Sequence, residues 1–403
     1  MADQNQEDDE FTLDPNEIVQ VIELDDNIGN GDEGDDPDDE EEDDNDDEMD
    51  TEEEASAGPV QDDSQLTFLG HKDSSVICAR ISPTDPHIAV TGGQDDRALV
   101  WNTQEGSIYF QCTGHTDTVS SVGFSHDGTM VATADMKGLI KVWKVDSGKE
   151  IWSFDVTEVE WIQWHHAAPV LLAGTKEGQV WMWKVPSGDC KTFAGFGPGA
   201  NCGRVLPDGK TACVGYEDGV IKIWDLKTEE LLHTISGYEG HKASVYCIDH
   251  NSAGNLALSG SGDMTAKVIN TATGKVLSTL KCKESGEEDD SVEAVGFSYT
   301  NDYAVTGTLG GGLEIWDLPT KSVRHTCEHP YGIVKVQWSK SSPTFYTSCL
   351  DGNLRQFDSR SGQVVRTWQG HRAAVLDFDL AGDESILVTA SDDTTAKVFH
   401  LQR

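Results

Sequence analysis

The residue types of a hydrolase, a hydroxyl, a histidine and an aspartate, occur many times in this 403-residue chain. In a catalytic triad the histidine takes a proton from the hydroxyl nucleophile and the carboxylate orients the imidazole ring. Here Gly-His pairs and single Asp residues return with a repeat of forty-odd residues. The chain also lacks the Gly-x-Ser-x-Gly pattern of a nucleophile elbow. A catalytic site does not recur along a chain in this way, so we expect structural roles for these residues and no enzymatic activity.

Patterns for phosphate or metal binding are weak. Gly209-Lys210-Thr211 ends like a P-loop, but Arg204 stands where such a loop needs its first glycine. His165 and His166 form a His pair, and adjacent side chains on a strand point to opposite faces. The nine cysteines never form a Cys-x-x-Cys pair. We therefore expect no metal site and no cofactor.

The chain is organised around a short apolar strand, seen as LIKVW at 139–143. The pattern returns eight times, at 98–102, 140–144, 180–184, 221–225, 266–270, 313–317, 354–358 and 396–400. The large residues near its end are 40 to 47 positions apart. A strand with this period is typical of a β-propeller blade. The sequence predicts an all-β propeller of eight blades, with seven as the alternative.

The second repeat shows the strands that each blade needs. Apolar segments at 119–124, 130–134, 139–143 and 150–154 are separated by turns rich in Gly, Asp and Ser. No segment of the chain has convincing helical periodicity. The last repeat stops after its third strand, and residues 65–70 precede the first inner strand. We expect these residues to close the ring as the fourth strand of the last blade, which removes the open edge.

Residues 1–63 have a different composition from the rest. They hold 30 of the 72 acidic residues and none of the 29 basic ones, which leaves a formal charge of −13 on residues 64–403. Such a segment cannot bury a core and should be disordered. Within it, residues 17–26 carry an apolar patch of Ile18, Val19, Val21, Ile22 and Leu24. This patch is either a partly ordered segment on the propeller or a docking motif for another protein.

Charge and composition also limit the partners and the location. Both parts of the chain are acidic, so phosphate backbones would repel them and direct nucleic-acid binding is not expected. A basic protein partner is favoured instead. No apolar run approaches the roughly 18 residues of a membrane span, and the N-terminus lacks the features of a signal peptide. The scattered cysteines indicate reduced thiols. We expect a cytoplasmic monomer, with the nucleus as an additional location.

The repeats resemble those of the WD-repeat family. That family ends a blade strand in Trp-Asp and places Gly-His some 25 to 30 residues earlier; here Trp224-Asp225 and Gly240-His241 are examples. The resemblance covers 64–403 and implies a hydrogen-bonded set of His, Asp, Ser or Thr and Trp inside each blade, because buried polar groups need partners. The residues that carry it are His71, Asp95, Trp101, His115, Trp143, Asp218, Trp224, His241, Asp263, Trp316, Asp351, His371 and Asp393.

Some repeats depart from the family pattern. Lys137, Glu177 and Gly310 stand where Asp is expected, so the second, third and sixth repeats should lack the full set. The third, fourth and sixth repeats also lack Gly-His, and the seventh has Glu328-His329. We expect these blades to depend more on packing.

A closer resemblance extends through nearly the whole chain, to one subfamily of WD-repeat proteins. It rests on EIVQVIELD in the acidic tail and on AVTGGQDDRALVW, WSFDVTEVEWIQWH and GRVLPDGKTACVGYEDGVIKIWDL in the repeats. That subfamily is similar to a fungal chaperone that holds a newly made, basic large-subunit ribosomal protein. Its vertebrate members are linked to cell migration and angiogenesis. The resemblance implies a chaperone in ribosome assembly, with a signalling adaptor in cell migration and angiogenesis as the alternative.

Binding by a propeller is expected at one end of its central channel. The loops before the inner strands and those after the second strands should meet there. Acidic residues in these loops would suit a Lys- and Arg-rich segment through charge-assisted hydrogen bonds, although each could instead be solvated surface charge. Trp161 would add a cation–π contact, with core packing as its alternative. The acidic candidates are Asp117, Glu158, Glu160, Glu217, Glu293 and Asp392.

Overall fold

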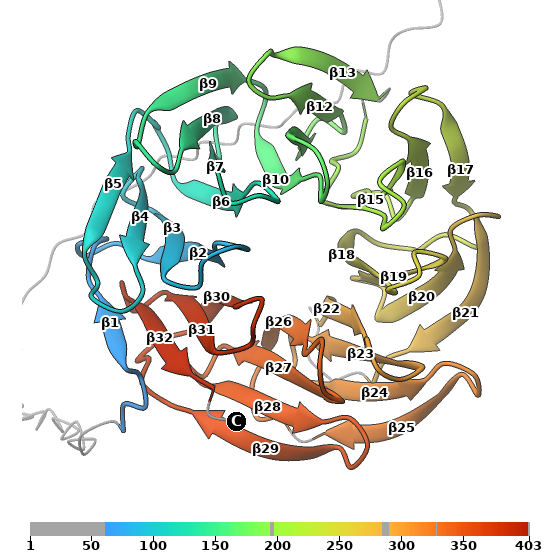
Figure 1. Ribbon diagram of the computed structural model, residues 1–403. Coiled ribbons are helices and arrows are strands. Elements are labelled where there is room, and N and C mark those ends of the chain that lie inside the picture. The colour runs from blue at the N-terminus through green and yellow to red at the C-terminus, as the bar shows by residue number, and fades with distance from the viewer. Residues whose placement is uncertain (1–60, 194–196, 284–289, 328, 402–403) are drawn as a thin grey trace, which may run out of the picture. The chain divides into compact units, whose positions relative to one another are not determined.

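The computed structural model describes residues 61–193, 197–283, 290–327 and 329–401. These residues form a ring of eight four-stranded antiparallel sheets around a central opening (Figure 1), which confirms the all-β, eight-bladed propeller. Within the described ranges there is no helix that could cross a membrane. The docking motif expected at residues 17–26 lies outside the described residues.

The strands of the first four sheets have the following bounds. The first sheet holds β2 Val76–Ile81, β3 Ile88–Gly93, β4 Ala98–Asn102 and β5 Ile108–Cys112. The second holds β6 Val119–Phe124, β7 Met130–Asp135, β8 Leu139–Lys144 and β9 Glu150–Asp155. The third holds β10 Val159–Trp164, β11 Val170–Thr175, β12 Val180–Lys184 and β13 Asp189–Phe193. The fourth holds β14 Cys202–Val205, β15 Thr211–Gly215, β16 Ile221–Asp225 and β17 Leu231–Ile235.

The other four sheets follow the same plan. The fifth holds β18 Val245–His250, β19 Leu256–Ser261, β20 Thr265–Asn270 and β21 Lys275–Lys281. The sixth holds β22 Val292–Phe297, β23 Tyr303–Thr308, β24 Leu313–Asp317 and β25 Ser322–Cys327. The seventh holds β26 Ile333–Trp338, β27 Thr344–Cys349, β28 Leu354–Asp358 and β29 Gln363–Trp368. The eighth holds β30 Val375–Leu380, β31 Ile386–Ser391, β32 Ala396–His400 and, from the start of the chain, β1 Leu66–Phe68.

The eighth sheet joins the two ends of the repeat region. Its strand order is β1-β32-β31-β30, and β1 pairs antiparallel with β32 so that Thr67 lies opposite Lys397. Asp62, just before β1, accepts a hydrogen bond from the Lys397 ammonium at 2.6 Å. The ring is therefore closed by backbone hydrogen bonds between residues more than 300 positions apart, and β1 covers the edge that β32 would otherwise expose.

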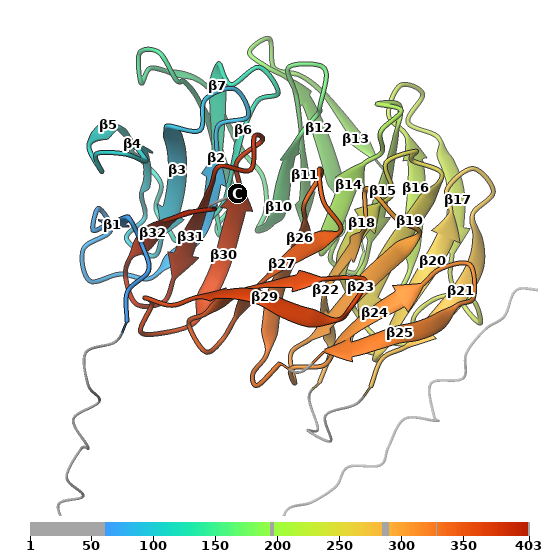
Figure 2. The same ribbon diagram turned by 60° about the horizontal axis from the view of Figure 1, so that its bottom comes forward.

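Burial differs between the second and outer strands because the blades pack face to face. All six residues of β31 are buried, since both faces of this strand lie against neighbouring sheets. Small and β-branched side chains suit such a position because they fill a pleated surface without strain. The outer strand β21 instead alternates between exposed and partly buried residues over most of its length. The side view in Figure 2 shows the sheets standing side by side around the ring.

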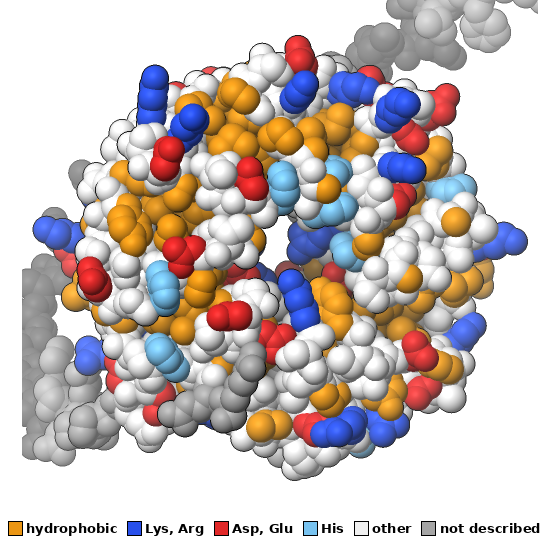
Figure 3. All heavy atoms as spheres, in the orientation of Figure 1, with side chains coloured by type: hydrophobic (Ala, Val, Ile, Leu, Met, Phe, Trp, Pro, Cys, Tyr) orange, Lys and Arg blue, Asp and Glu red, His pale blue; other side chains and the backbone are white. Residues whose placement is uncertain are grey.

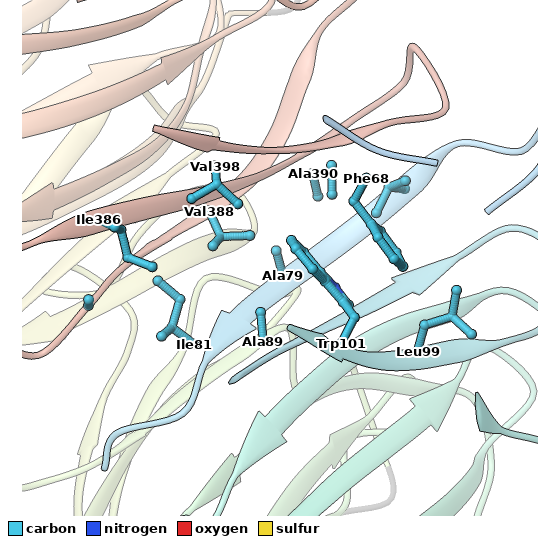
Figure 4. Close-up of a cluster of buried hydrophobic side chains, with 13 residues drawn as sticks. Phe68, Ala79, Ile81, Ala89, Leu99, Trp101, Ile386, Val388, Ala390 and Val398 are labelled. Carbon is cyan, nitrogen blue, oxygen red and sulfur yellow. The ribbon is translucent and has the colours of Figure 1, made fainter. Parts of the chain in front are cut away.

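The hydrophobic core is divided into clusters that lie between adjacent blades. One cluster joins the eighth and first blades, and it contains Phe68, Trp101 and Val398 (Figure 4). The rings of Phe68 and Trp101 stack with their centroids 4.2 Å apart and an interplanar angle of 5°. Stacking of this kind stabilises the contact beyond its buried area. The residue that closes the ring is thus also part of the core.

A bulge recurs near the start of the inner strand. In seven of the eight sheets the pairing of the first two strands shifts by one residue there, as between Val159 and Trp161. The extra residue at each bulge has no partner on the neighbouring strand, so its side chain breaks the regular alternation between the two faces of the sheet. The bulge residues are Ile77, Ser120, Glu160, Tyr246, Glu293, Val334 and Leu376. Two of the predicted partner-binding acids, Glu160 and Glu293, therefore stand at equivalent positions.

Candidate protein-binding face

Antiparallel strands place two kinds of loop at the same end of the ring. The connections between blades and the turns between second and third strands share one face, which we call the crossover face. It consists of 69–75, 94–97, 113–118, 136–138, 156–158, 176–179, 197–201, 216–220, 236–244, 262–264, 290–291, 309–312, 329–332, 350–353, 369–374 and 392–395. Figures 1 and 3 look onto the opposite face, where β32 ends, and the crossover face is directed downward in Figure 2.

One backbone hydrogen bond fixes the crossover face in every blade. The residue that follows the second strand donates its N–H to the carbonyl of a residue just before the inner strand, as Lys176 does to Glu158 at 2.9 Å. The eight donors are Gln94, Met136, Lys176, Glu217, Gly262, Leu309, Leu350 and Asp392. These residues occupy equivalent places around the mouth of the channel. Their side chains differ from blade to blade, so they give each part of the face its own chemistry.

The central channel has a volume of about 880 Å³ and is lined by the inner strands. Figure 3 shows Lys and Arg side chains inside it and His side chains at its rim on the opposite face. Asp377 receives hydrogen bonds from the Lys335 ammonium at 2.8 Å and from the Ala79 amide at 3.1 Å, and it is paired with Arg80. Burial would raise the pKa of Asp377, but Arg80 and Lys335 hold it below its usual value. This network joins three inner strands and has a structural role.

Three of the predicted partner-binding acids interact at the third and fourth blades, with Glu158 and Glu217 in loops of the crossover face and Glu160 at the bulge near the start of β10. Glu158 forms an ion pair with Lys176 at 2.7 Å, and Glu217 accepts a hydrogen bond from the Gly199 amide at 3.3 Å. Burial raises the pKa of Glu160; Lys176 opposes the shift, and the nearby charges of Glu158 and Glu217 add to it. We call Glu158, Glu160 and Glu217 the acidic cluster. It joins the third and fourth blades although its members are up to 59 positions apart.

The other three predicted acids stand on different blades, each with a partner of its own. Asp117 lies 3.4 Å from the Lys137 ammonium, and Asp392 accepts a hydrogen bond from the Ser75 hydroxyl. Glu293 is on β22 rather than in a loop, and it lines the channel while accepting a hydrogen bond from Ser291 at 2.5 Å. The predicted set is therefore one cluster of three carboxylates and three separate acids.

Trp161 packs within the protein. Its indole N–H donates to the Ala200 carbonyl at 2.9 Å. A β-carbon on Gly174 or Gly203 would come within 2.2 Å of the ring, so both glycines allow the indole to lie against the backbone. Trp161 is partly buried and packs against the core cluster between the third and fourth blades, and its contact with a partner's cation stays a prediction.

The structural set predicted from the family resemblance is complete in the second blade, and three other blades form its histidine contacts. In the second blade the Trp143 indole donates to Thr133 at 3.2 Å, Thr133 lies 2.7 Å from His115 Nε2, and His115 Nδ1 lies 3.1 Å from Asp135. Because a carboxylate can only accept, the histidine Nδ1–H must be the donor. His71 with Asp95 and Thr91, His241 with Asp263 and Ser259, and His371 with Asp393 and Thr389 form the same histidine contacts.

The second blade corrects the prediction made for it. Lys137 stands where the family has its Asp, and the full set was expected to be missing. Asp135, two residues earlier at the end of β7, supplies the carboxylate, and its side chain is fully buried. It also accepts hydrogen bonds from the amides of Gly138 at 3.1 Å and Leu139 at 2.9 Å. The sequence did contain a sign of this carboxylate: the Asp in ATADMKG stands two positions before the place where the family has its Asp.

Two aspartates of the predicted set have other partners. Asp218 lies in an exposed turn and accepts a hydrogen bond from the Val220 amide at 3.1 Å, so it does not belong to a buried set. Asp351 forms an ion pair with Arg355, whereas His329 contacts the Tyr331 carbonyl. The buried indole N–H groups of Trp101 and Trp224 have no hydrogen-bond partner among the described residues. These tryptophans contribute by packing, while Trp316 does donate to Thr306 at 2.9 Å.

Two of the histidine–aspartate pairs should make stability fall in acid. Burial would raise the pKa of Asp263 and Asp393, but hydrogen bonds from His241 and His371 hold both well below the usual range. Their stabilising contribution is present above the unfolded pKa of about 3.9 and is lost as pH falls below it. We expect the D263N/D393N variant to lose less stability than the wild type between pH 5 and pH 2.5, measured by urea unfolding. A variant with Asp146→Asn and Asp189→Asn, two exposed acids, is the control and should keep the wild-type slope.

His165 and His166 do not point to opposite faces, which corrects the earlier argument. β10 ends at Trp164, so the two residues belong to the following turn, and their rings stack at 4.7 Å. His165 is held by the Gly209 carbonyl at 2.9 Å and the Ala167 amide at 3.1 Å. No group of three or more His, Cys, Asp or Glu among the described residues is arranged to hold a metal ion.

Comparison with known proteins agrees with this geometry. The "WD domain, G-beta repeat" family matches residues 63–102, 106–144, 190–225, 229–270, 321–358 and 362–400. The stretches between these matches include 145–189 and 271–320, which contain the third strands of the third and sixth blades. Those are the repeats that lack both the Gly-His pair and the Asp at its usual place.

Whole-chain relatives extend the comparison. The chain is 48% identical to human angio-associated migratory cell protein over 352 residues, covering 85% of this chain and 81% of the relative. It is 26% identical to the ribosome assembly protein SQT1 of Saccharomyces cerevisiae over 394 residues, covering 88% and 90%. The solved structure of Chaetomium thermophilum Sqt1 bound to the N-terminus of ribosomal protein L10 aligns with a TM-score of 0.76 at 21% identity, covering 85% of this chain and 100% of that one. The chain thus belongs to the WD-repeat family and, within it, to the family of angio-associated migratory cell proteins.

Proposed function

We propose that this protein is a non-enzymatic chaperone for a basic large-subunit ribosomal protein, which it binds on the crossover face. The observation that carries the proposal is the acidic cluster of Glu158, Glu160 and Glu217, in which Glu158 is paired with the Lys176 ammonium at 2.7 Å and the charges of Glu160 and Glu217 also act on that ammonium. The raised pKa of Glu160 reflects burial together with the nearby negative charges. A partner's Lys or Arg would compensate that excess of negative charge.

Physical chemistry favours a cationic segment as the ligand. Hydrogen bonds between a carboxylate and an ammonium or guanidinium group are charge-assisted and stronger than neutral ones. The formal charge of −13 on residues 64–403, with a further −30 on residues 1–63, would also attract a basic protein over a distance. Shielding such a segment until it reaches the assembling subunit would prevent its contact with other polyanions.

Similarity to SQT1 supports the same assignment. SQT1 is named as a ribosome assembly protein, and the Chaetomium thermophilum protein was crystallised with the N-terminus of ribosomal protein L10. The shared eight-bladed architecture makes an equivalent use of this chain reasonable. We therefore take the N-terminal segment of ribosomal protein L10 as the first ligand to test.

Reversing the acidic cluster should weaken this binding strongly. We expect E158K/E160K/E217K to lower the affinity for an L10 N-terminal peptide on the order of 100-fold at low salt, because three attractive contacts become repulsive. The logarithm of the affinity should also depend less steeply on salt concentration. Isothermal titration calorimetry at several salt concentrations measures both quantities.

A matched control keeps the change in net charge the same. Glu105, Asp146 and Asp189 are exposed acids at the opposite end of the ring, and E105K/D146K/D189K should bind almost as the wild type does. Affinity purification with mass spectrometry extends the test to cells, where the wild type should recover the ribosomal protein and the cluster variant should not. If the wild type recovers no ribosomal protein, the chaperone proposal is wrong.

A second candidate is an adaptor in cell migration and angiogenesis. It is favoured by the 48% identity to angio-associated migratory cell protein, whose name records that link. An adaptor would bind several unrelated proteins, and residues 17–26 would supply a second docking site. Replacing Ile22 and Leu24 by Ser should then remove partners that the acidic-cluster variant retains, as measured by the same purification. Identical partner sets for these two variants would count against the adaptor role.

A further inference from the structure

Large apolar side chains are exposed on the crossover face at the sixth and seventh blades. Leu309 is 41% exposed, Tyr331 is 59% exposed and Leu350 is 40% exposed. Leu309 and Leu350 follow β23 and β27, and they occupy two of the eight equivalent positions around the mouth of the channel. We call these three residues the apolar patch. These three side chains take no part in the histidine-centred hydrogen bonds of the blades or in the Asp377 network of the channel.

The three residues meet around Gly332. Leu350 donates its backbone N–H to the Gly332 carbonyl at 3.0 Å. A β-carbon on Gly332 would lie 2.3 Å from the Leu309 carbonyl oxygen and 2.8 Å from a terminal methyl of Leu350. Tyr331 precedes this glycine in the chain. The absence of a side chain at 332 therefore lets the Leu350 side chain lie close to the backbone of Leu309, so the two leucine-bearing turns of neighbouring blades approach each other.

Hydrogen bonds and an ion pair hold the loops of the patch in place. His329 Nδ1 donates to the Tyr331 carbonyl at 2.8 Å, and burial lowers the pKa of this histidine to about 4, so the ring is neutral at physiological pH. The turn that follows Leu350 is fixed by the Asp351–Arg355 ion pair and by a 3.0 Å bond from the Asn353 amide to Asp351. A surface that is already ordered loses little conformational entropy when a ligand binds. The patch thus has the properties of a preformed subsite.

The acidic cluster lies across the channel from the apolar patch. Figure 1 shows the third blade, β10–β13, and the seventh blade, β26–β29, on opposite sides of the ring. The crossover face therefore carries both the acidic cluster and the apolar patch around one mouth. A segment that binds both the acidic cluster and the apolar patch must carry Lys or Arg residues. It must also carry at least one large aliphatic or aromatic residue, separated from them by the width of the channel.

We propose that the apolar patch binds a large apolar side chain of the same basic segment that the acidic cluster binds. This inference rests on the proposed function and specifies the chemistry of its ligand. Charge complementarity identifies the occupant. A second copy of this chain would bring a second acidic cluster to the same mouth, and residues 1–60, with 28 acids and no base, would be repelled by it.

Affinity measurements with an L10 N-terminal peptide test the subsite. We expect L309S/L350S to bind the peptide roughly 10- to 100-fold more weakly at every salt concentration, because two part-exposed leucines no longer lose water-exposed surface on binding. The salt dependence should stay as in the wild type, and the heat-capacity change on binding should become less negative. The control variant V364S/V365S replaces two exposed valines on the outer strand β29 and should bind as the wild type does.

A second peptide completes the test. In it, every large apolar residue of the L10 segment is replaced by Ser while all Lys and Arg residues are kept. The wild type should bind this peptide more weakly than the native one, whereas L309S/L350S should bind both with nearly equal affinity. All protein variants should melt within about 2 °C of the wild type because the changed side chains are exposed.

The outcomes separate this inference from the proposed function. If the wild type binds neither peptide, the proposed function fails. If the wild type binds the native peptide and the acidic-cluster variant does not, but L309S/L350S equals the wild type, the proposed function stands and the apolar subsite is wrong. If removing residues 1–60 strengthens binding of the native peptide to the wild type and not to L309S/L350S, the chain's own N-terminal segment occupies the patch, and our assignment of the occupant is overturned.

Discussion

A chain that begins at residue 71 should melt at least about 10 °C below a chain that begins at residue 61. The longer chain keeps β1, which provides the fourth strand of the eighth blade, and Phe68, which stacks on Trp101 in the core between the eighth and first blades. Removing a buried Phe side chain by itself destabilises a protein by about 3 to 5 kcal/mol. The shorter chain also loses Asp62, the partner of the buried Lys397 ammonium, and an unpaired buried charge is strongly destabilising.

Two controls separate ring closure from a general effect of truncation. The chain that begins at residue 61 should melt with the full-length protein, because residues 1–60 contribute acids and little apolar surface. Within β1 and its loop, Phe68→Ala should destabilise the protein by about 3 kcal/mol or more, whereas Leu69→Ala, at an exposed neighbouring position, should change stability by less than about 0.5 kcal/mol. Differential scanning calorimetry measures all four variants. Equal melting temperatures for the two truncated chains would disprove closure by β1.

Asp135→Ala should destabilise the protein by about 3 to 5 kcal/mol, and Asp218→Ala by less than about 1 kcal/mol. Asp135 is fully buried and accepts hydrogen bonds from His115 and from the backbone amides of Gly138 and Leu139. Its removal takes this acceptor from the buried His115 Nδ1–H and from the Leu139 amide, whereas the Gly138 amide keeps its bond to the backbone carbonyl of residue 135. Asp218 is exposed, and water can replace its single bond to the Val220 amide.

This pair of variants distinguishes the tertiary structure from the repeat pattern. Asp218 occupies the position that the WD-repeat pattern assigns to the structural Asp, whereas Asp135 does not. Denaturant unfolding at pH 7 gives both free energies of unfolding. A larger loss for Asp218→Ala than for Asp135→Ala would mean that sequence position, and not the observed hydrogen bonds, determines the role. His115→Ala should be nearly as damaging as Asp135→Ala, and the double variant should lose less than the sum, because both residues belong to one network.

The two sides of the crossover face suggest how specificity could arise in a propeller without a deep pocket. The eight equivalent positions at the mouth of the channel carry different side chains: Glu217 belongs to the acidic cluster, Lys176 pairs with that cluster, and Leu309 and Leu350 belong to the apolar patch. Charge alone would favour any basic protein and would be weakened by salt. The proposed apolar subsite would add the requirement of a large apolar residue, which charge alone does not impose.

The sequence by itself determined the architecture, because the information for it is local and repeated. The strands and turns of one blade are encoded by a stretch of about forty residues, and the recurrence of the LIKVW pattern identifies eight such stretches. The Trp, Gly-His and Asp positions also placed four histidines correctly in their buried sets. The acidic candidates for the crossover face followed from the alternation of loops, which antiparallel strands enforce.

The tertiary structure decided which of these candidates act together. The inner-strand bulge positions Glu160 near Glu158 and Glu217, and no local pattern indicates that residues 59 positions apart would meet while Asp117 and Asp392 would not. It also determines that Asp135 rather than Asp218 is buried against a histidine, and that Trp161 packs against a core cluster. The sequence does not predict the apolar patch, because nothing in the pattern marks Leu309 and Leu350 as exposed. Their exposure and their proximity follow from the packing of two blades around Gly332. Repeats specify a scaffold, and the packing between repeats determines which side chains face the same partner.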